Sequence, residues 1–431
     1  MNARSFLKQN LPPQLKGLVH QLRSKIAAPP IDEVVLADHT ITIEASDIPR
    51  LTMVVPLLQK GADFGGTATG IDIFARLCLA LQAHRPIDVR FIITDVVSET
   101  DPSIITGRAA KAGLTIGADQ ITLVRSPDTA IAVRPHELFV TYNWWTTLNF
   151  IAVRDAQAQA FGQPPRPLVW LMQDYEPAFM EFSSAHMLAR AAYDTAAPLW
   201  GVINSSSLAE YIAAVGHSFE RSFVFEPVIS DALRPYLDRV ASSKRRKRLL
   251  VYGRPNVARN CFPALIRGLK RWVQDYPEFS DWEIISAGVE HEPVDLGHGR
   301  RLVSVGKLSL DDYAEMLLSC SAGVSLMASP HPSYPPLEMA HFGVRTVTNG
   351  YVCKDLSTFH PNITSLRSIA EAPMAAALAE ACRASASPAQ IFRNPEYLRE
   401  DAYLFMADLR AAVLDAMMQG PAQPLVTPAD A

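Results

Sequence analysis

The chain has 431 residues, of which 48% are hydrophobic and 19% are charged, a composition typical of a globular protein with more than one core. Its net charge of -4 gives no overall case for nucleic-acid binding, and its five scattered cysteines have neither metal-ligand spacing nor an even disulfide framework. No apolar run approaches the roughly 18 residues of a membrane span and no signal-peptide pattern is present, so we expect a cytoplasmic protein with reduced thiols.

Residues 1–45 form a predicted N-terminal basic segment. From Met1 to Ile31 the chain has no Asp or Glu, while five Lys and Arg residues are mixed with apolar ones. Such a segment suits an anionic inner-leaflet surface, which predicts peripheral contact with the cytoplasmic membrane. Because Pro12 and Pro13 interrupt the helical pattern, a solvated or partner-packed helix explains the segment equally well.

Residues 46–243 alternate between strand-like and helix-like patterns. The first helix is expected over 71–83, where Ile71, Phe74, Leu77 and Leu81 recur at helical spacing. Short apolar runs predict strands at 51–58, 89–93, 120–124, 138–142, 168–172 and 199–203. This alternation predicts a doubly wound α/β domain with a parallel sheet.

A glycine-rich loop at 60–70 separates the first of these strands from the first helix. Adjacent Gly65 and Gly66 would let the backbone approach an anion, with amide groups and the helix dipole pointing at it. The loop is not GxGxxG, so the dinucleotide fingerprint is absent. Glycines in such turns are often only steric, and both interpretations stay open.

A second candidate site follows the strand at 168–172. Asp174 and Glu176 lie at its carboxyl end, where one of them could act as a base or bind sugar hydroxyls. The structural alternative is helix capping by Asp174, with Glu176 near the helix dipole. In the preceding loop, Trp144 and Trp145 could form an aromatic wall for a sugar ring, although core packing is the commoner use of such residues. Trp144, Trp145 and Glu176 are therefore our candidates for the acceptor side of a site.

A basic run at 241–248 predicts a domain boundary, with a second domain over residues 244–395. Because the run lacks interleaved aromatic residues, it is typical of a solvated linker or a strand flank rather than of a nucleic-acid site. Three cations follow strands of the second series: Arg254 and Arg259 after a strand at 249–253, and Lys307 after a strand at 302–305. Since the carboxyl ends of parallel strands share one edge of a sheet, we expect these cations to converge.

The stretch at 321–347 has the pattern of a strand, a proline-rich loop, a helix and a strand. A helix that begins near Pro335 and ends near Gly343 places Tyr334 and Glu338 at the same edge as the cations. Arg and Lys suit a diphosphate, a carboxylate suits the hydroxyls of a ribose, and an aromatic side chain suits a base or a sugar. Together these groups predict a nucleotide-sugar site, whereas surface ion pairing is the structural alternative.

Four motifs extend this prediction: Phe64-Gly65-Gly66, Gln173-Asp174-Tyr175-Glu176-Pro177, Gly253-Arg254-Pro255 and Ser333-Tyr334-Pro335-Pro336-Leu337-Glu338. In this set the chain resembles the GT-B glycosyltransferases and, within them, the WsaF-type bacterial rhamnosyltransferases of cell-surface glycan assembly. The resemblance implies two doubly wound, Rossmann-like α/β domains that face a central cleft. It also implies dTDP-β-L-rhamnose as the donor and a polysaccharide or lipid-linked glycan as the acceptor. By the same resemblance, Arg254, Lys307, Tyr334 and Glu338 bind the nucleotide diphosphate.

One position departs from the broader retaining GT-B pattern, in which Glu338 would match the second of two glutamates. The first glutamate stands eight positions earlier, where this chain has Pro330. A contact to a donor hydroxyl is therefore missing or is supplied by another group, such as His331. A dTDP donor also lacks the ribose 2′-hydroxyl, so the diol argument favours UDP or GDP, whereas the resemblance favours dTDP.

The predicted chemistry is glycosyl transfer without a metal ion or another cofactor. Negative charge on the departing diphosphate would be stabilised by Arg254, Arg259, Lys307 and the amides near Gly65 and Gly66. No Asp-x-Asp metal motif appears where a divalent cation would be needed. Asp174 is the predicted base, unless the diphosphate itself takes the proton of the acceptor.

The last segment, residues 396–431, completes the predicted organisation. A helical pattern at 395–418 is expected to return to the first domain, followed by a disordered tail at 422–431. Two rival functions stay open at this point. A GT-B-fold sugar-nucleotide epimerase would turn over its substrate with no acceptor, and a non-catalytic nucleotide-sugar-binding protein would bind the donor without transfer.

Overall fold

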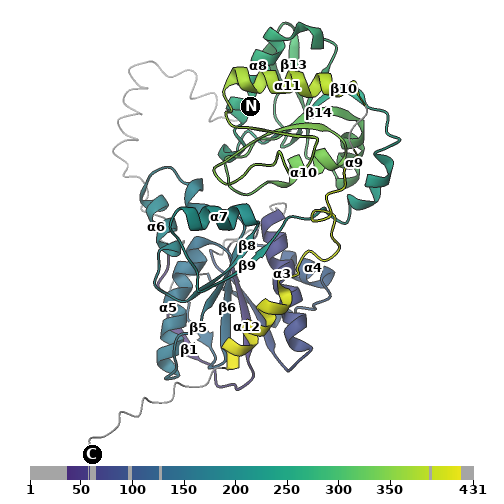
Figure 1. Cartoon of the computed structure of the whole chain (residues 1–431). Coiled ribbons are helices and arrows are strands. Elements are labelled where there is room, and N and C mark those ends of the chain that lie inside the picture. Colours follow the sequence, from purple (N-terminus) through teal and green to yellow (C-terminus); the bar gives the residue numbers. More distant parts are fainter. Residues whose placement is uncertain are drawn as a thin grey trace, which may run out of the picture.

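The computed structural model describes residues 36–56, 58, 65–95, 100–125, 129–387 and 391–418. Within these residues the chain forms two lobes, each built on a seven-stranded sheet with helices on both faces (Figure 1). The predicted basic stretch at 1–31 and the predicted tail at 422–431 lie outside the described residues.

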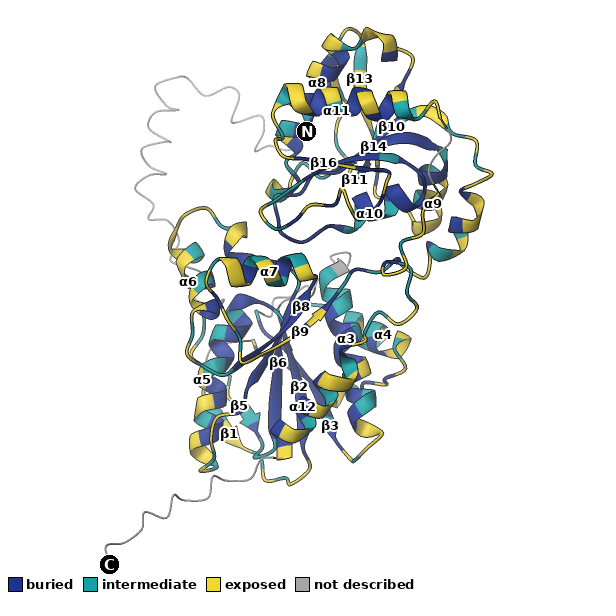
Figure 2. Ribbon diagram, viewed as in Figure 1, coloured by how far each residue is buried: buried dark blue, intermediate teal, exposed yellow. Residues whose placement is uncertain are grey.

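The first-lobe sheet is parallel throughout, in the order β4-β3-β2-β6-β7-β8-β9. Most of its strands are buried on both faces, because helices cover both sides of the sheet (Figure 2). The strands are β2 (Arg50–Val55), β3 (Asp88–Ile93), β4 (Ile121–Leu123), β6 (Glu137–Thr141), β7 (Leu168–Met172), β8 (Leu199–Asn204) and β9 (Arg221–Phe225). The helices are α3 (Gly65–Gln82), α4 (Ser103–Lys111), α5 (Trp144–Ala160), α6 (Ser184–Tyr193) and α7 (Ser206–Ala214). A short parallel pair, β1 (Ile41–Ile43) and β5 (Ile131–Val133), packs beside α5.

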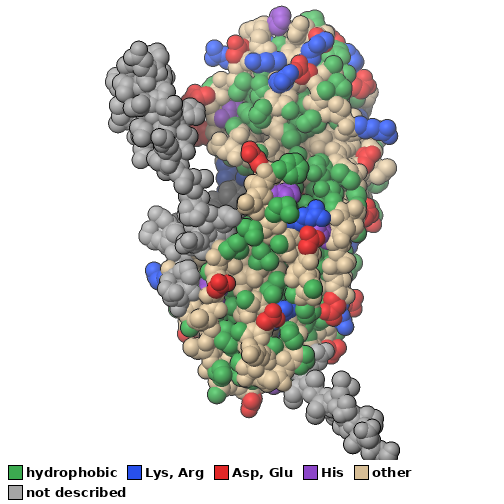
Figure 3. Space-filling view, turned by 90° about the vertical axis from the view of Figure 1, so that its left-hand side faces the viewer, with side chains coloured by type: hydrophobic (Ala, Val, Ile, Leu, Met, Phe, Trp, Pro, Cys, Tyr) green, Lys and Arg blue, Asp and Glu red, His purple; other side chains and the backbone are tan. Residues whose placement is uncertain are grey.

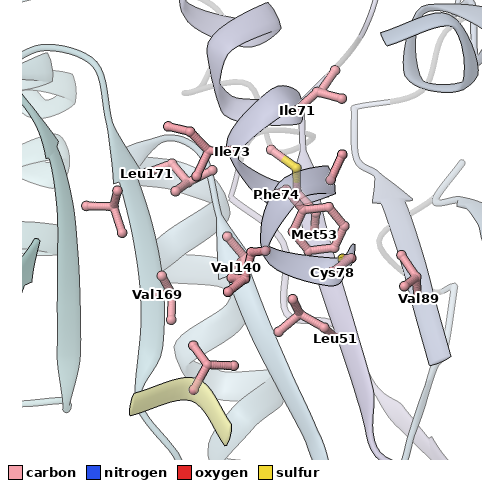
Figure 4. Packing of buried hydrophobic residues seen from close by; sticks show 14 of the residues in the cluster. Leu51, Met53, Ile71, Ile73, Phe74, Cys78, Val89, Val140, Val169 and Leu171 are labelled. Atoms are coloured by element: carbon pink, nitrogen blue, oxygen red, sulfur yellow. The ribbon is translucent and has the colours of Figure 1, made fainter. Parts of the chain in front are cut away.

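Alternate residues of the first-lobe strands serve two separate cores. Leu51 and Met53 of β2 point to the face that carries α3, where Phe74 packs over them (Figure 4). Val54, the residue after Met53, points to the opposite face and belongs to the cluster under α5, α6 and α7. This arrangement fixes which helices lie on each side of the sheet and leaves the carboxyl ends of the strands at one edge.

The second-lobe sheet has the order β12-β13-β11-β10-β14-β15-β16 and is parallel except for the β12–β13 pair. The strands are β10 (Arg246–Gly253), β11 (Glu283–Gly288), β12 (Val294–Gly297), β13 (Arg300–Gly306), β14 (Cys320–Val324), β15 (Arg345–Asn349) and β16 (Ile363–Leu366). The helices are α8 (Phe262–Asp275), α9 (Leu310–Ser319), α10 (Tyr334–His341) and α11 (Glu371–Ala384). The strand order reverses between β10 and β14, as it does between β2 and β6 in the first lobe, and open α/β sheets bind ligands at such points.

The chain enters the second lobe ahead of the predicted boundary at residue 244. Ile229, Leu233 and Leu237 already pack in the core of the second lobe, because they are apolar residues that the first lobe leaves uncovered. Of the two interpretations of the basic run, the strand flank is confirmed, since β10 begins within the run at Arg246.

The returning helix α12 (Met406–Met418) packs on α3 and β6 of the first lobe. It begins later than the helical pattern from residue 395 suggests, because Tyr397 is still fully buried in the second-lobe core. The outgoing and returning segments are bonded to each other. The Ile229 amide donates to the Tyr397 carbonyl at 3.0 Å, and Arg234 Nη1 donates to the Leu398 carbonyl at 2.7 Å.

Charged side chains of both signs are mixed over the surface. On the face shown in Figure 3, Lys and Arg stand among Asp and Glu on both lobes. The described part of that face therefore lacks the single basic stripe that is typical of nucleic-acid binding proteins. None of the helices in the described ranges is long and apolar enough to cross a membrane.

Candidate functional site

The carboxyl edges of the two sheets meet between the lobes. Ser329, in the loop after β14, donates from Oγ to Asp174 Oδ1 at 2.6 Å, and Asp174 lies just after β7 of the first lobe. Ser207, on α7, donates from Oγ to the Pro330 carbonyl at 2.8 Å. These two contacts bring the acidic edge of the first lobe against the loop that leads into α10.

Two of the predicted cations leave the second-lobe sheet at the same edge. Arg254 follows the last residue of β10, and Lys307 follows the last residue of β13. The register of β10, β11 and β13 sets these strand ends side by side, with β11 between them. Lys307 is exposed, whereas Arg254 is partly buried and interacts with the Tyr252 side chain.

Arg259 lies in a short 3-10 helix, Ala258–Asn260, between β10 and α8. Its guanidinium stands 4.3 Å from the centre of the Phe179 ring, which belongs to the first lobe. Burial raises the pKa of Asp174, and the charge of Arg259 acts in the opposite direction. Arg259 therefore faces the first lobe directly and lies within electrostatic reach of its acidic edge.

Tyr334 and Glu338 stand one turn apart on α10 and so share a face of that helix. Burial raises the pKa of Glu338 to about 7, and the interaction with the Tyr313 hydroxyl opposes this shift. The pKa of Tyr252 is raised by burial and by the Glu338 charge, and it is lowered by Arg254. The structure thus brings Glu338 and Arg254 into one neighbourhood.

The Tyr334 side chain reaches the first lobe. Burial raises its pKa, and hydrogen bonding with Asn204, at the end of β8, and with Thr69, on α3, opposes this rise. Tyr334 therefore connects the start of α10 with both the sheet edge and the first helix of the opposite lobe.

Helix α3 begins at Gly65, earlier than the expected start at residue 71, so Gly65 and Gly66 lie in its first turn and not in a loop. A Cβ atom at Gly66 would lie 2.8 Å from the hydroxyl oxygen of Tyr142, so a side chain there would collide with that ring. The steric interpretation is sufficient for Gly66, and the anion-binding role of the two glycines stays a prediction. Burial raises the pKa of Tyr142 to about 12, and the charge of Arg259 is among the groups that lower it. Arg259 therefore lies within electrostatic reach of the Tyr142 hydroxyl, which packs on α3.

Asp174 is 6% exposed and lies on the first-lobe side of the contact between the lobes. Its Oδ1 accepts the Ser329 hydrogen bond and a second one from the Tyr175 amide at 2.9 Å. Asp174 therefore bonds the opposite lobe and its own loop, in place of the helix cap that was the structural alternative.

Glu176 binds the start of a different helix from the one expected. Its Oε2 accepts a hydrogen bond from the amide of Trp144, the first residue of α5, at 2.8 Å. Burial raises the pKa of Glu176 to about 8, and this hydrogen bond opposes the shift. The carboxyl oxygen of Glu176 therefore satisfies an amide at the start of α5, a role that its place in the sequence does not reveal.

The two tryptophans have different environments. Trp144 is 3% exposed and belongs to the core under α5, so its ring is not part of the predicted aromatic wall, because burial among apolar side chains is its more favourable place. Trp145 is partly exposed, and its Nε1 donates to Asp95 Oδ2 at 2.8 Å. Of the pair, Trp145 is the one that keeps accessible aromatic surface.

Lys354 is a charged residue of this region that sequence reasoning missed. It is 2% exposed, and its Nζ donates to the Met327 carbonyl at 2.8 Å. Burial lowers its pKa to about 8, and the charge of Asp174 opposes this. Lys354 follows β15, so the rule that found Arg254 and Lys307 at strand ends would have found it in the loop after that strand.

The arrangement can bind an anion and accept hydrogen bonds from hydroxyl groups. Arg254, Arg259 and Lys354 supply positive charge between the lobes, and Glu338 supplies an acceptor beside them. In the part of the chain that the structure describes, no group of three or more His, Cys, Asp and Glu residues is placed to hold a metal ion.

Two family models match the sequence. The model of the WsaF N-terminal domain matches residues 50–206, and the model of the WsaF C-terminal domain matches residues 247–379. The O-antigen biosynthesis protein RfbC of Myxococcus xanthus is 26% identical over 286 residues, which cover 66% of this chain and 21% of that protein. The chain thus spans about a fifth of the length of this relative.

Solved structures with a similar fold include two sugar-related enzymes. Sucrose-phosphate synthase from Thermosynechococcus elongatus aligns with a TM-score of 0.53 and 14% identity over 85% of this chain and 100% of its own. The pneumococcal O-GlcNAc transferase GtfA, in complex with UDP and GlcNAc, aligns with a TM-score of 0.52 and 9% identity over 87% of this chain and 100% of its own. These alignments identify the two Rossmann-like lobes as a GT-B fold, as the sequence predicts.

Proposed function

This chain is a member of the WsaF family, and we propose that it is a glycosyltransferase that moves a sugar from a nucleoside-diphosphate donor to a glycan acceptor. The observation that carries the proposal is the neighbourhood of Arg254, Arg259 and Glu338 at the point where the strand order of the second lobe reverses. Guanidinium groups match a diphosphate, and a carboxylate matches the hydroxyls of a sugar or ribose.

For the donor we propose dTDP-β-L-rhamnose. The family membership supports this choice, and Pro330, which stands where the retaining GT-B pattern has a glutamate, is compatible with it. A 6-deoxy sugar presents fewer hydroxyls, which is compatible with the loss of one acceptor. UDP- and GDP-sugars are the alternative donors, because they would offer Glu338 a ribose diol.

In the proposed reaction, the bond between the anomeric carbon and the diphosphate oxygen breaks, and a bond to the acceptor oxygen forms. The proton of the acceptor hydroxyl passes to the departing phosphate oxygen or to Asp174. Negative charge stays on the nucleoside diphosphate, where Arg254, Arg259 and Lys307 stabilise it. The scheme uses no divalent cation, because these side chains supply the positive charge.

For the acceptor we propose a cell-surface polysaccharide or a lipid-linked glycan that enters from the first-lobe side near Trp145 and Asp174. The similarity to the O-antigen biosynthesis protein RfbC supports this class of acceptor. A cytoplasmic location, with peripheral contact to the inner membrane through residues 1–45, would bring the site close to a lipid-linked substrate.

Calorimetric titration with dTDP, UDP and GDP tests the proposal, followed by assays of donor hydrolysis with each matching sugar nucleotide. We expect dTDP to bind most tightly and dTDP-rhamnose to be hydrolysed slowly without an acceptor. Binding of none of the three nucleotides would contradict the proposed site. Tighter binding of UDP or GDP would contradict the proposed donor and leave the transferase proposal in place.

A further inference from the structure

His331 is buried in the loop before α10 with one ring nitrogen unpartnered. The side chain is 5% exposed, and its Nδ1 accepts a hydrogen bond from the Ser333 amide at 3.0 Å. Because Nδ1 is an acceptor, the proton of the neutral ring resides on Nε2. Nε2 is buried and has no hydrogen-bond partner among the described residues, which is unfavourable for an N–H group unless a ligand provides one.

The residues around His331 place it where the lobes meet. Ser329 and Pro330, immediately before it, bond Asp174 and Ser207 of the first lobe. The ring of Tyr334, three residues later, has its centre 5.9 Å from the centre of the imidazole. A ligand held between the lobes would therefore lie against this loop.

The start of α10 has unusually few amide donors for a helix N-terminus. Pro335 and Pro336 occupy its second and third positions and carry no N–H group. The amide of Ser333, at the N-cap, donates to His331, and Ser333 has a positive φ of 68°. The imidazole thus occupies a backbone donor of the helix start, while its own donor, Nε2–H, has no partner among the described residues.

The charges around the imidazole favour an anionic acceptor. Burial, Lys354 and Arg259 together lower the pKa of His331 to about 3, so the ring is neutral at ordinary pH. A neutral N–H group beside two cations and the positive end of a helix is complementary to a negatively charged oxygen more than to a hydroxyl oxygen.

We propose that His331 donates a hydrogen bond from Nε2 to a non-bridging oxygen of the donor diphosphate, an inference that rests on the proposed function. In this role His331 contacts the leaving group and stabilises its negative charge without carrying a charge itself. The ring fills the place that helix amides fill where no prolines interrupt the first turn.

Calorimetry with inorganic pyrophosphate, dTDP and dTDP-rhamnose tests the inference on the full chain. His331→Phe keeps a ring of similar size and removes the N–H donor, so we expect it to weaken pyrophosphate and dTDP binding by roughly tenfold. His331→Gln places an amide nitrogen near the position of Nε2 and should retain more affinity than the Phe variant. His341→Phe, at the other end of α10, is the matched control and should leave pyrophosphate binding unchanged.

The outcomes separate the inference from the proposed function. If His331→Phe binds pyrophosphate as tightly as the wild type, the inference is overturned. It is also overturned if the variant loses affinity for dTDP-rhamnose alone, because Nε2 would then contact a sugar hydroxyl. Wild-type protein that binds pyrophosphate through His331 but none of the nucleoside diphosphates would overturn the proposed function and keep the anion contact. If the Phe variant fails to fold, the Nε2–H proton resonance of His331 in the wild type should shift when pyrophosphate is added, and an unchanged resonance would count against the contact.

Discussion

Glu338 should make donor binding depend on pH. Burial raises its pKa to about 7, so about half of the carboxyl is ionised at pH 7. A ribose or sugar hydroxyl donates a stronger hydrogen bond to the ionised form, and donor affinity should therefore rise with pH. If the ionised form alone bound the donor, affinity at pH 6 would be about tenfold below its high-pH limit, and at pH 8 only about a tenth below it.

The assay is calorimetric titration with a nucleotide sugar at pH 6, 7 and 8, for the wild type and for Glu338→Gln. A nucleotide sugar is preferable to free dTDP, because a terminal phosphate titrates with a pKa of about 6 and would obscure the effect. Glu176 and Lys354, whose pKa values are both about 8, are present in both proteins and cancel in the comparison. Equal pH slopes in the two proteins would refute the assignment of Glu338 as the acceptor for a donor hydroxyl.

Three further predictions test the site and the fold. Arg254→Ala should weaken dTDP binding by roughly tenfold, and Lys307→Ala should weaken it less, because Lys307 is exposed. Calorimetry that finds the dTDP affinity of both variants unchanged would count against the diphosphate site. Turnover in an acceptor assay should be the same with and without EDTA, since the proposed scheme uses no metal, and loss of activity that Mg²⁺ restores would contradict it. Burial lowers the pKa of His360 from the ordinary 6.5 to about 4 in the folded protein. On acidification the unfolded chain therefore binds this proton first, and the free energy of unfolding decreases as pH falls from 6.5 to 4. Urea unfolding should therefore show the wild type losing stability relative to His360→Gln across that window, and parallel curves would exclude this role.

The sequence predicts the central strands well because they are buried on both faces. The run LVWLM appears as β7 with the expected bounds, since a short apolar run between turn residues has few other solutions in an α/β chain. The edge strand β9, with the sequence RSFVF, is not predicted, because it begins with two polar residues and only Phe223 and Phe225 are buried. The sequence predicts the start of β10 three residues late, at Leu249, because Arg246–Arg248 are basic; in the structure Arg248 pairs with Glu283 of the neighbouring strand.

The position of the site was predictable from topology, whereas the environments of its residues were not. Arg254, Lys307 and Glu338 could be placed at one edge because parallel strands share their carboxyl ends. The burial of Trp144 and Lys354 depends on side chains distant in the sequence, and a single sequence gives no measure of it. The hydrogen bond from Trp144 to Glu176 likewise depends on how two neighbouring crossovers pack, which hydrophobic periodicity does not encode.

The two segments that join the lobes run side by side and are tied by the hydrogen bonds from Ile229 to Tyr397 and from Arg234 to Leu398. Both bonds lie on the second-lobe side, because Ile229 and Tyr397 belong to the core of that lobe. The two connecting segments therefore leave the second lobe from one shared anchor, and a shift of one segment would carry the other with it. Substitutions that weaken these hydrogen bonds should alter how Ser329 meets Asp174 and how Tyr334 meets Asn204, although none of those four residues is changed.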